Sequence, residues 1–418
     1  MVMKVLWITN ILFPEAEHLL TGSGELKSSG GWMLGAANAL LNNKEVRLCV
    51  ASVSSKVNSL TKLEGQHITY YILPFGKGNL HINLDYCPYW QQINDEIKPD
   101  IVHIHGTEFS HGHAYMKACG GNHVVISIQG MTSAYYYYCY GLTKSDIYRN
   151  LTVRDIIKGT VIHGQKQFCR RAQYEIEMIN MAKHVIGRTS WDRSHVWAIN
   201  PEAEYHFCNE TLRPEFYVGD KWCYNKCQKH TIFLSQAYYP IKGFHQVLKA
   251  MPLILRHFPD AKIRVAGSDI TKSSTFLQKL RLSGYGKYIK TLIKNNCLAE
   301  FISFTGNLNA EQMKQEYLNC NIFVCPSSIE NSPNSLGEAQ ILGTPCIASY
   351  VGGIPDMMRG NEDNLYRFEE VEMLAEKVCR VFSDGENQTD LSAIAAQRHD
   401  PLNNNQQLLS IYKRIIER

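Results

Sequence analysis

Short runs of β-branched and other apolar residues recur along the whole chain, and this feature limits the fold more than any other. Segments with helical spacing of apolar residues separate the runs. A strand that is apolar along nearly its whole length has both faces buried, which is typical of parallel sheets covered by helices. The expected strands lie at 4–12, 46–52, 68–73, 101–106, 123–130 and 184–189 in the first half, and at 231–236, 262–267, 302–306, 321–326 and 345–349 in the second.

A break in this alternation divides the chain. Residues 213–229 lose the periodicity, and the strand–helix pattern starts again after them. A chain of 418 residues is also too long for one ordinary core. We therefore expect an α/β protein with two doubly wound, Rossmann-like domains at 1–212 and 230–399, joined by a linker at 213–229.

Composition indicates a globular protein, with 44% hydrophobic and 20% charged residues. No apolar run approaches the ~18 residues that a membrane-spanning helix needs. The apolar N-terminal run is broken by Thr9, Asn10 and Pro14, so it does not resemble a secretory signal. Thirteen cysteines without such a signal predict free thiols, and we expect a cytoplasmic location.

One group of histidines and cysteines near the break could in principle bind zinc. It consists of His206, Cys208, Cys223, Cys227 and His230. The spacing matches no familiar zinc finger, so we favour buried thiols in a connecting region. We expect no metal in the functional site.

Basic residues are concentrated in the segment between Lys144 and Arg193, which holds ten basic and five acidic residues in a chain of net charge +4. Five tyrosines at 135–138 and 140 precede it. Basic and aromatic residues together indicate peripheral membrane contact through 135–193. The alternative is a set of solvated helices beside a packed aromatic loop. Nucleic acid is not expected, because no nucleic-acid-binding motif accompanies the charge.

Ligands of parallel sheets bind beyond the carboxyl ends of the strands, so residues that follow the strands are candidates. In the first domain, Gly30 and Gly31 precede a helix and would let an anion approach backbone amides, although two glycines also suit a plain turn. His105 and Glu108 follow one strand, and Gln129 ends the next. These three side chains are candidates for the acceptor side of a site.

In the second domain, Lys242 opens an amphipathic helix. A lysine at this end opposes the helix dipole, which is understandable if Lys242 and the helix end share an anionic ligand. The alternative is an ordinary surface lysine. Gly267 and Gly306 stand at the ends of the next two strands, where a close approach or a tight turn is needed.

Two carboxylates, Glu330 and Glu338, bracket the start of a later helix. Pro333, Asn334 and Ser335 mark that start, where unpaired amides can bind an anion. Carboxylates accept hydrogen bonds from vicinal sugar hydroxyls, and a nucleotide sugar places its diphosphate between two sugars. The alternative is one capping acid and one solvated acid.

These residues resemble a known family, the retaining GT-B glycosyltransferases of family 4, also called glycosyl transferases group 1. The E-x7-E motif matches Glu330 and Glu338, and the KGF, VAG and FTG segments at Lys242, Gly267 and Gly306 follow in family order. The resemblance implies that Glu330 lies by the donor hexose and Glu338 binds the nucleotide ribose. It further implies that Lys242 contacts the diphosphate, and that a C-terminal helix at about 400–418 returns to the first domain.

The chain departs from the family pattern at three places. Ala237 stands where many members have an arginine that pairs with the diphosphate. Gln129 replaces a histidine before Gly130, and SPN replaces the usual glycine–aromatic–glycine between the two glutamates. These differences affect the expected affinity for the diphosphate and the identity of the donor.

The implied activity is retaining transfer of a hexose from a UDP- or GDP-linked donor to a sugar or lipid-linked glycan, in surface polysaccharide biosynthesis and without a further cofactor. Catalytic roles fall to Glu330 and Lys242. One alternative is another GT-B enzyme, either a nucleotide-sugar epimerase or a phosphorylase with pyridoxal phosphate. The other is a non-catalytic module that binds sugars or membranes.

Overall fold

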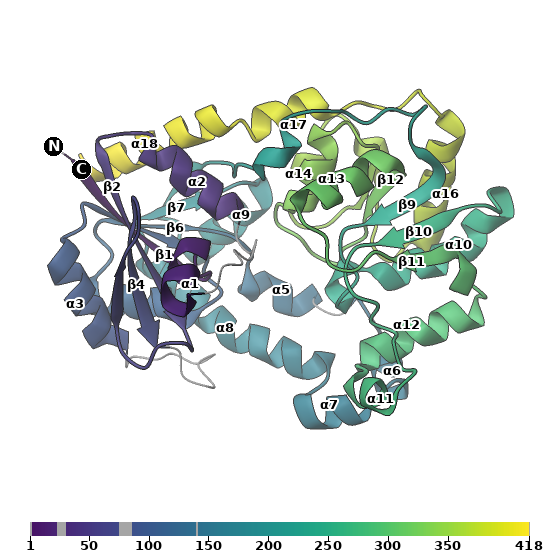
Figure 1. The fold of residues 1–418 in the computed structure, drawn as a ribbon, viewed down its shortest axis with the longest axis horizontal. Helices are drawn as coiled ribbons and strands as arrows, with labels where there is room; N and C mark the ends of the chain where they lie inside the picture. Colours follow the sequence, from purple (N-terminus) through teal and green to yellow (C-terminus); the bar gives the residue numbers. More distant parts are fainter. Residues whose placement is uncertain (1, 23–30, 75–85, 139–140, 418) are drawn as a thin grey trace. The chain divides into compact units, whose positions relative to one another are not determined.

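The computed structural model describes residues 2–22, 31–74, 86–138 and 141–417, and the chain divides into two compact units. The N-terminal unit comprises residues 1–136, 167–213 and 399–418. The C-terminal unit comprises residues 137–166 and 214–398 (Figure 1). In the described part of the chain, no helix is both long and apolar enough to cross a bilayer. The twelve cysteines in these ranges are free thiols.

The N-terminal unit is built on an eight-stranded sheet with the order β3-β4-β2-β1-β5-β6-β7-β8. All neighbouring strands are parallel except β3, which is antiparallel to β4. The side chains of Val5, Leu6, Trp7 and Ile8 in β1 are fully buried, as expected for a strand covered on both faces. The strands are β1 (Met3–Thr9), β2 (Val46–Ser54), β3 (Thr61–Glu64), β4 (Thr69–Pro74), β5 (Ile101–His105), β6 (Val124–Ser127), β7 (His184–Gly187) and β8 (Glu204–Phe207).

Helices of this unit connect the strands and include the last helix of the chain. They are α1 (Pro14–Thr21), α2 (Gly31–Leu41), α3 (Cys87–Ile97), α4 (Ser110–Cys119), α5 (Thr132–Tyr138), α8 (Val161–Met181), α9 (Ser190–Ile199) and α18 (Pro401–Ile416). The chain passes between the units within α5 and within α8. Ile411 and Tyr412 of α18 pack in one apolar cluster with Val5 and Trp7 of β1, so the C-terminal helix completes the N-terminal core.

The C-terminal unit contains a six-stranded, fully parallel sheet with the order β11-β10-β9-β12-β13-β14. Its strands are β9 (Gln228–Leu234), β10 (Lys262–Val265), β11 (Ile302–Phe304), β12 (Cys320–Cys325), β13 (Cys346–Ser349) and β14 (Leu365–Tyr366). Its helices are α6 (Lys144–Arg149), α7 (Val153–Lys158), α10 (Phe244–His257), α11 (Phe276–Arg281), α12 (Gly284–Asn295), α13 (Ala310–Asn319), α14 (Asn334–Ile341), α15 (Ile354–Met357), α16 (Val371–Asp384) and α17 (Ser392–Arg398).

Residues 137–166 belong with the C-terminal unit, whereas the sequence pattern placed them in a domain at 1–212. Three long-range hydrogen bonds explain this difference. Ser328 Oγ donates to the Tyr138 carbonyl at 2.8 Å, and the His245 ring contacts the Gly141 carbonyl at 2.6 Å. The Lys287 ammonium donates to the Leu151 carbonyl at 3.3 Å.

The expected linker at 213–229 is also anchored in the C-terminal unit. The backbone amide of Trp222 donates to the Leu342 carbonyl, and its indole N–H donates to the Cys320 carbonyl, both at 2.8 Å. Apart from a 3₁₀ turn at Pro214–Phe216 and the start of β9 at Gln228, the segment is held by individual contacts, which explains why its sequence shows no strand or helix periodicity.

We predict that Tyr412→Phe destabilises the N-terminal unit. The Tyr412 hydroxyl accepts a hydrogen bond from Trp7 Nε1 at 2.9 Å and contacts His103 Nδ1 at 2.6 Å, so its loss leaves two buried groups unpaired. The free energy of unfolding should fall by about 1–3 kcal/mol in urea titrations. Tyr350→Phe is the control, because Tyr350 is 61% exposed. Equal unfolding midpoints for both variants would contradict the packing of α18.

Candidate functional site

Lys242 ends a short 3₁₀ turn, Pro240–Lys242, that follows β9 and precedes α10. Gly243 forms the junction with a φ of 70°. A Cβ atom at this position would lie 1.6 Å from the Pro326 carbonyl oxygen, so both the conformation and the space require glycine. This close approach fixes Lys242 against the loop that follows β12.

Lys242 forms an ion pair with Glu330, and the Nζ–Oε1 distance is 2.5 Å. Ser327 Oγ donates to the same carboxylate oxygen at 2.9 Å. Burial by itself would lower the pKa of Lys242, but the charge of Glu330 raises the pKa above its ordinary value. Lys242 therefore keeps its positive charge, and Glu330 compensates it.

The loop that carries Glu330 is held rigidly from several directions. The Ser328 amide donates to the Ile241 carbonyl at 2.8 Å, and Ser349 Oγ donates to the Ser327 carbonyl at 2.5 Å. The Glu330 carbonyl accepts the Gly353 amide at 3.0 Å. At the neighbouring Gly352, with φ 52°, a Cβ would lie 1.9 Å from that same carbonyl oxygen. The carboxylate thus sits on a preorganised backbone.

Helix α14 begins directly after this loop, with Pro333 as its N-cap residue and Asn334 as its first residue. Leu336 and Gly337 donate the first backbone bonds back to the Pro333 carbonyl. The amides of Asn334 and Ser335 therefore lie at the helix end, where an anion is favoured. Glu338 lies one turn further along and is 4% exposed.

Gly267 lies just beyond β10 and pairs with Gly306, which lies just beyond β11. The two residues exchange backbone hydrogen bonds of 2.8 and 3.2 Å. Both have positive φ angles, 101° and 79°, and no other atom lies within 4 Å of a Cβ at either position. Their conformation, and not a shortage of space, is what favours glycine here.

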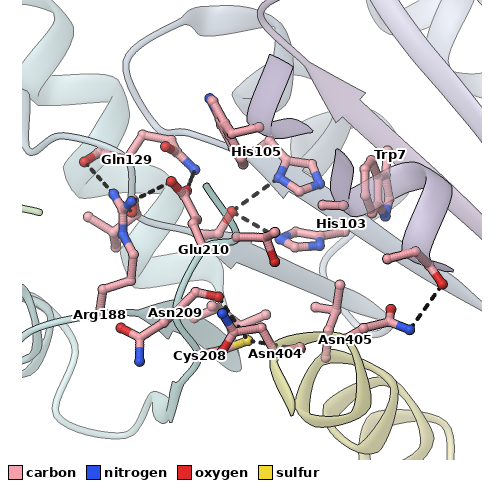
Figure 2. Close-up of a pocket in the computed structure, with 18 residues that line it drawn as sticks. Trp7, His103, His105, Gln129, Arg188, Cys208, Asn209, Glu210, Asn404 and Asn405 are labelled. Carbon is pink, nitrogen blue, oxygen red and sulfur yellow. Dashed lines mark hydrogen bonds and ion pairs between the residues drawn. The ribbon is translucent and has the colours of Figure 1, made fainter. Parts of the chain in front are cut away.

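In the N-terminal unit, His105 and Gln129 line a cavity of about 60 Å³ (Figure 2). The cavity lies among the ends of β5, β6 and β7 and residues of α2 and α18. A typical ligand pocket measures about 300–1,000 Å³, so this cavity alone does not hold a sugar ring. Gly31 is the first residue of α2, while Gly30 lies outside the described residues.

His105 is packed between other rings. Its ring stacks on His103 at 3.8 Å between centroids and meets the edge of Trp7 at 4.5 Å. Its Nε2 atom is buried and has no hydrogen-bond partner among the described residues. Burial lowers the pKa of His105 to about 3, so the ring is neutral near pH 7.

Gln129 belongs to a polar network with two residues that sequence reasoning missed, Arg188 and Glu210 (Figure 2). The Gln129 amide donates to Glu210 Oε1 at 2.7 Å. The Arg188 guanidinium pairs with Glu210 at 2.6 Å and donates to the Gln129 carbonyl at 3.0 Å. Arg188 lies near the end of the strand expected at 184–189, so its position was a usable signal, whereas Glu210 follows β8, which was not predicted.

Glu108 does not line this cavity. Its carboxylate accepts the Gly130 amide at 2.9 Å and lies 3.5 Å from Asn10 Nδ2. Burial raises the pKa of Glu108 to about 7, and the nearby charge of Glu175 acts in the same direction. Of the three predicted acceptor-side residues, Glu108 is therefore the one whose charge changes near neutral pH.

The histidine and cysteine group considered for zinc is not gathered around one point in either unit. Cys208 Sγ contacts the Asn404 carbonyl at 3.7 Å, and Cys227 Sγ contacts the Tyr224 carbonyl. His230 pairs with Asp260 at 2.8 Å.

His206 instead lies with His184 and Glu204, and these three place their donor atoms within 4.8 Å of one another. Arg414 also pairs with Glu204 at 2.7 Å. Within the described ranges this is the one group with the arrangement of a metal site.

Comparison with known proteins finds a family match within the C-terminal unit. Residues 224–398 match the family model described as "Glycosyl transferases group 1". The match covers less than half of the 418 residues and falls within the C-terminal unit. Lys242, Glu330 and the start of α14 all lie inside the matched segment, and the Pro333 cap and Glu338 belong to it too.

Curated relatives that match part of the chain are glycosyltransferases by name. An uncharacterized glycosyltransferase of Methanocaldococcus jannaschii is 27% identical over 159 residues, which is 38% of this chain and 36% of the relative. The D-inositol 3-phosphate glycosyltransferase of Streptomyces coelicolor is 28% identical over 171 residues, 38% of this chain and 34% of the relative. The matches thus span little more than a third of these relatives.

Solved structures confirm the predicted GT-B fold. Sucrose-phosphate synthase from Thermosynechococcus elongatus superimposes with a TM-score of 0.71 at 15% identity, covering 99% of both chains. Trehalose-6-phosphate synthase from E. coli, bound with UDP-2-fluoro glucose, gives a TM-score of 0.61 at 10% identity over 99% of both chains. At these identities the likeness shows a shared architecture.

We predict that Gly243→Ala destabilises the C-terminal unit more than Gly306→Ala does. Both glycines have similar positive φ angles, 70° and 79°, so the backbone strain of about 1 kcal/mol is common to both variants. Only at Gly243 does the new Cβ also collide with a backbone oxygen. The additional loss in free energy of unfolding should be about 2 kcal/mol or more. Equal losses would show that the contact with Pro326 is not a constraint.

A second prediction concerns Glu108 and pH. Between pH 4.5 and 7 the unfolded chain ionises this carboxyl while the folded protein keeps it protonated, so stability is lost as pH rises through this interval. Glu108→Gln removes that loss. Its free energy of unfolding relative to wild type should therefore increase by about 2–3 kcal/mol from pH 4.5 to 7.5. Urea titrations at four pH values test this, and parallel pH profiles would contradict the raised pKa.

Proposed function

We propose that the protein is a retaining glycosyltransferase of family 4 that uses a nucleotide-sugar donor. The observation that carries the proposal is the Lys242–Glu330 ion pair beside the start of α14, inside a group 1 domain. The cation and the helix end favour a diphosphate. The flanking carboxylates of Glu330 and Glu338 suit the sugars on its two sides.

Donor binding would exchange the partner of Lys242. In the structure the ammonium group is neutralised by Glu330 at 2.5 Å. A bound diphosphate carries more negative charge and would take over this contact, together with the amides of Asn334 and Ser335. Glu330 would then turn its oxygens toward the hydroxyls of the donor hexose, while Glu338 would hold the ribose. Gly267 lies at a neighbouring strand end on the donor side.

The transfer step needs the departing charge to be stabilised. The bond between the anomeric carbon and the phosphate oxygen breaks, and its electron pair goes to the diphosphate beside Lys242. The acceptor oxygen bonds to the anomeric carbon on the same face, and its proton passes to the departing phosphate oxygen. Each charge-assisted contact contributes about 1.5–3 kcal/mol. We expect no further cofactor and no metal.

We propose a sugar or lipid-linked glycan as acceptor, in surface polysaccharide biosynthesis at the cytoplasmic face of a membrane. One relative supports a lipid-linked acceptor by name. It is a GDP-mannose-dependent phosphatidylinositol monomannoside mannosyltransferase of Corynebacterium glutamicum, 26% identical over 35% of this chain and 36% of the relative. His105, Glu108, Gln129, Gly30 and Gly31 stay predictions for the substrate-binding residues of the N-terminal unit.

A non-catalytic binding module is the second candidate, because Ala237 and Gln129 replace residues that many family members use. An epimerase is a third, and it would turn over the donor without an acceptor. Isothermal titration with UDP and GDP, followed by product analysis with and without acceptor, separates the three. A module binds without turnover, and an epimerase acts without acceptor.

The partner exchange at Lys242 makes two opposite predictions. Lys242→Met should weaken UDP or GDP binding about 10- to 100-fold, because a charge-assisted contact is lost. It should leave binding of uridine or guanosine unchanged. Glu330→Gln should bind the nucleoside diphosphate at least as tightly as wild type, because a competitor for Lys242 is removed, while sugar transfer falls at least 10-fold.

Calorimetry and a transfer assay check both variants, with Lys262→Met as the control because Lys262 is an exposed lysine of β10. Thermal unfolding shows whether the variants fold. Folded Lys242→Met that binds UDP and GDP like wild type would remove Lys242 from the donor site.

A further inference from the structure

Helices α7 and α11 expose large apolar side chains to an unusual degree. Ile156 and Ile157 of α7 are 80% and 75% exposed, and Phe276 and Leu277 of α11 are 74% and 63% exposed. Val153 is 53% exposed and adds to the same group. Apolar residues exposed singly are ordinary, but a contiguous group marks an interaction surface.

The two helices form one surface although they are far apart in sequence. Both belong to the C-terminal unit, and α7 packs beside α11 (Figure 1). Helix α12, which follows α11 directly, also approaches α7, since a Cβ at Gly284 would lie 2.5 Å from Asp155 Oδ2. The Lys287 ammonium of α12 donates to the Leu151 carbonyl, just before α7, at 3.3 Å. We call the exposed faces of α7 and α11 the docking patch, defined by Val153, Ile156, Ile157, Phe276, Leu277 and Leu280.

The segments that carry the docking patch are strongly basic. Residues 141–166 hold five lysines and arginines against two acids, and residues 271–296 hold six against none. The whole chain has a net charge of only +4. The two acids, Asp146 and Asp155, are engaged in the capping boxes of α6 and α7. Asp155 also lies 4.0 Å from Arg154, so the acids offset part of the positive charge, and the basic residues remain in excess.

A large cavity adjoins the patch. Its volume is about 640 Å³, and its basic lining residues are Arg154 of α7, Arg281 of α11 and Lys272, which precedes α11. Asp146, Asp155 and Asp269 line it too. This size is within the range of ligand pockets. Guanidinium and ammonium groups bind phosphate oxygens well, so the cavity suits a phosphate headgroup.

We infer that the docking patch binds the surface of an anionic phospholipid bilayer, with the apolar side chains entering the headgroup region and the basic residues contacting lipid phosphates. A second copy of the chain is a poorer partner, because two such patches would bring like charges together. The inference rests on exposure and charge alone and does not depend on the proposed transfer reaction. The patch overlaps the membrane contact expected through 135–193 in α7, and it extends that contact to α11.

Vesicle co-sedimentation with the full chain tests the inference. Wild type should bind vesicles of phosphatidylcholine with about 30% phosphatidylglycerol, and binding should fall at least fivefold in 0.5 M NaCl or with phosphatidylcholine alone. The double variants Ile156→Ser/Ile157→Ser and Phe276→Ser/Leu277→Ser should each bind at least fivefold more weakly. Lys279→Glu/Arg281→Glu should bind anionic vesicles more weakly still, since it reverses two charges.

Leu402→Ser is the matched control, because Leu402 is a 73% exposed apolar residue of α18 in the N-terminal unit. Its vesicle binding should equal that of wild type. Each variant should unfold at the wild-type temperature, since the exchanged side chains are exposed. Absence of wild-type binding to anionic vesicles, or unchanged binding by both apolar variants, would overturn the inference. A wild-type dimer that the patch variants convert to monomer in sedimentation velocity would assign the patch to self-association instead.

Discussion

The part-buried ion pair between Lys242 and Glu330 is the interaction that joins the loop after β9 to the loop after β12 in the C-terminal unit. Removing an ammonium and a carboxylate from water costs several kcal/mol for each ion, and only close pairing offsets it. The pair therefore requires that two chain segments 88 residues apart be held within hydrogen-bond distance. Gly243 and Gly352 make this possible, because each allows a backbone approach that any side chain would prevent. The same rigidity that stabilises the pair would position a ligand that displaces one partner.

Much of the fold was predictable because parallel strands buried on both faces are apolar along their whole length. Val5 to Ile8 illustrate this, since all four are fully buried. The missed strand β8 shows the limit of this signal. It is an edge strand of four residues, paired on one side only, and it contains Glu204 and His206, so it lacks the apolar run. Because β8 was not predicted, Glu210 beyond its end and the partner it provides for Arg188 were not predicted either.

Segment 137–166 was placed in the wrong unit for a different reason. Its helices α6 and α7 are short, and each begins with a capping box, at Thr143 and at Thr152. These local signals predict the helices themselves but not the part of the chain against which the helices pack. Contacts such as His245 with the Gly141 carbonyl join residues more than 100 positions apart. Lys242, Glu330 and α14 were predictable because each position follows from a strand end or a helix start. The mutual pairing of Lys242 and Glu330 was not, since a sequence shows which residues converge but not which atoms meet.

Lys242, His105 and Glu108 are polar groups with three different surroundings, and this separates their responses to pH. In the C-terminal unit Lys242 is paired with an acid, and that charge raises its pKa, so its ionisation does not change near neutrality. In the N-terminal unit His105 is buried without a charged partner, and burial drives its pKa to about 3 and leaves it neutral. Glu108 lies between these extremes, because burial raises its pKa to about 7 while the Gly130 amide and the charge of Arg171 limit the rise. Of these three residues, Glu108 is therefore the one whose charge changes near neutral pH. It follows that a pH dependence arising from these groups would be a property of the N-terminal unit, while the fixed charge that favours a diphosphate in the C-terminal unit would persist.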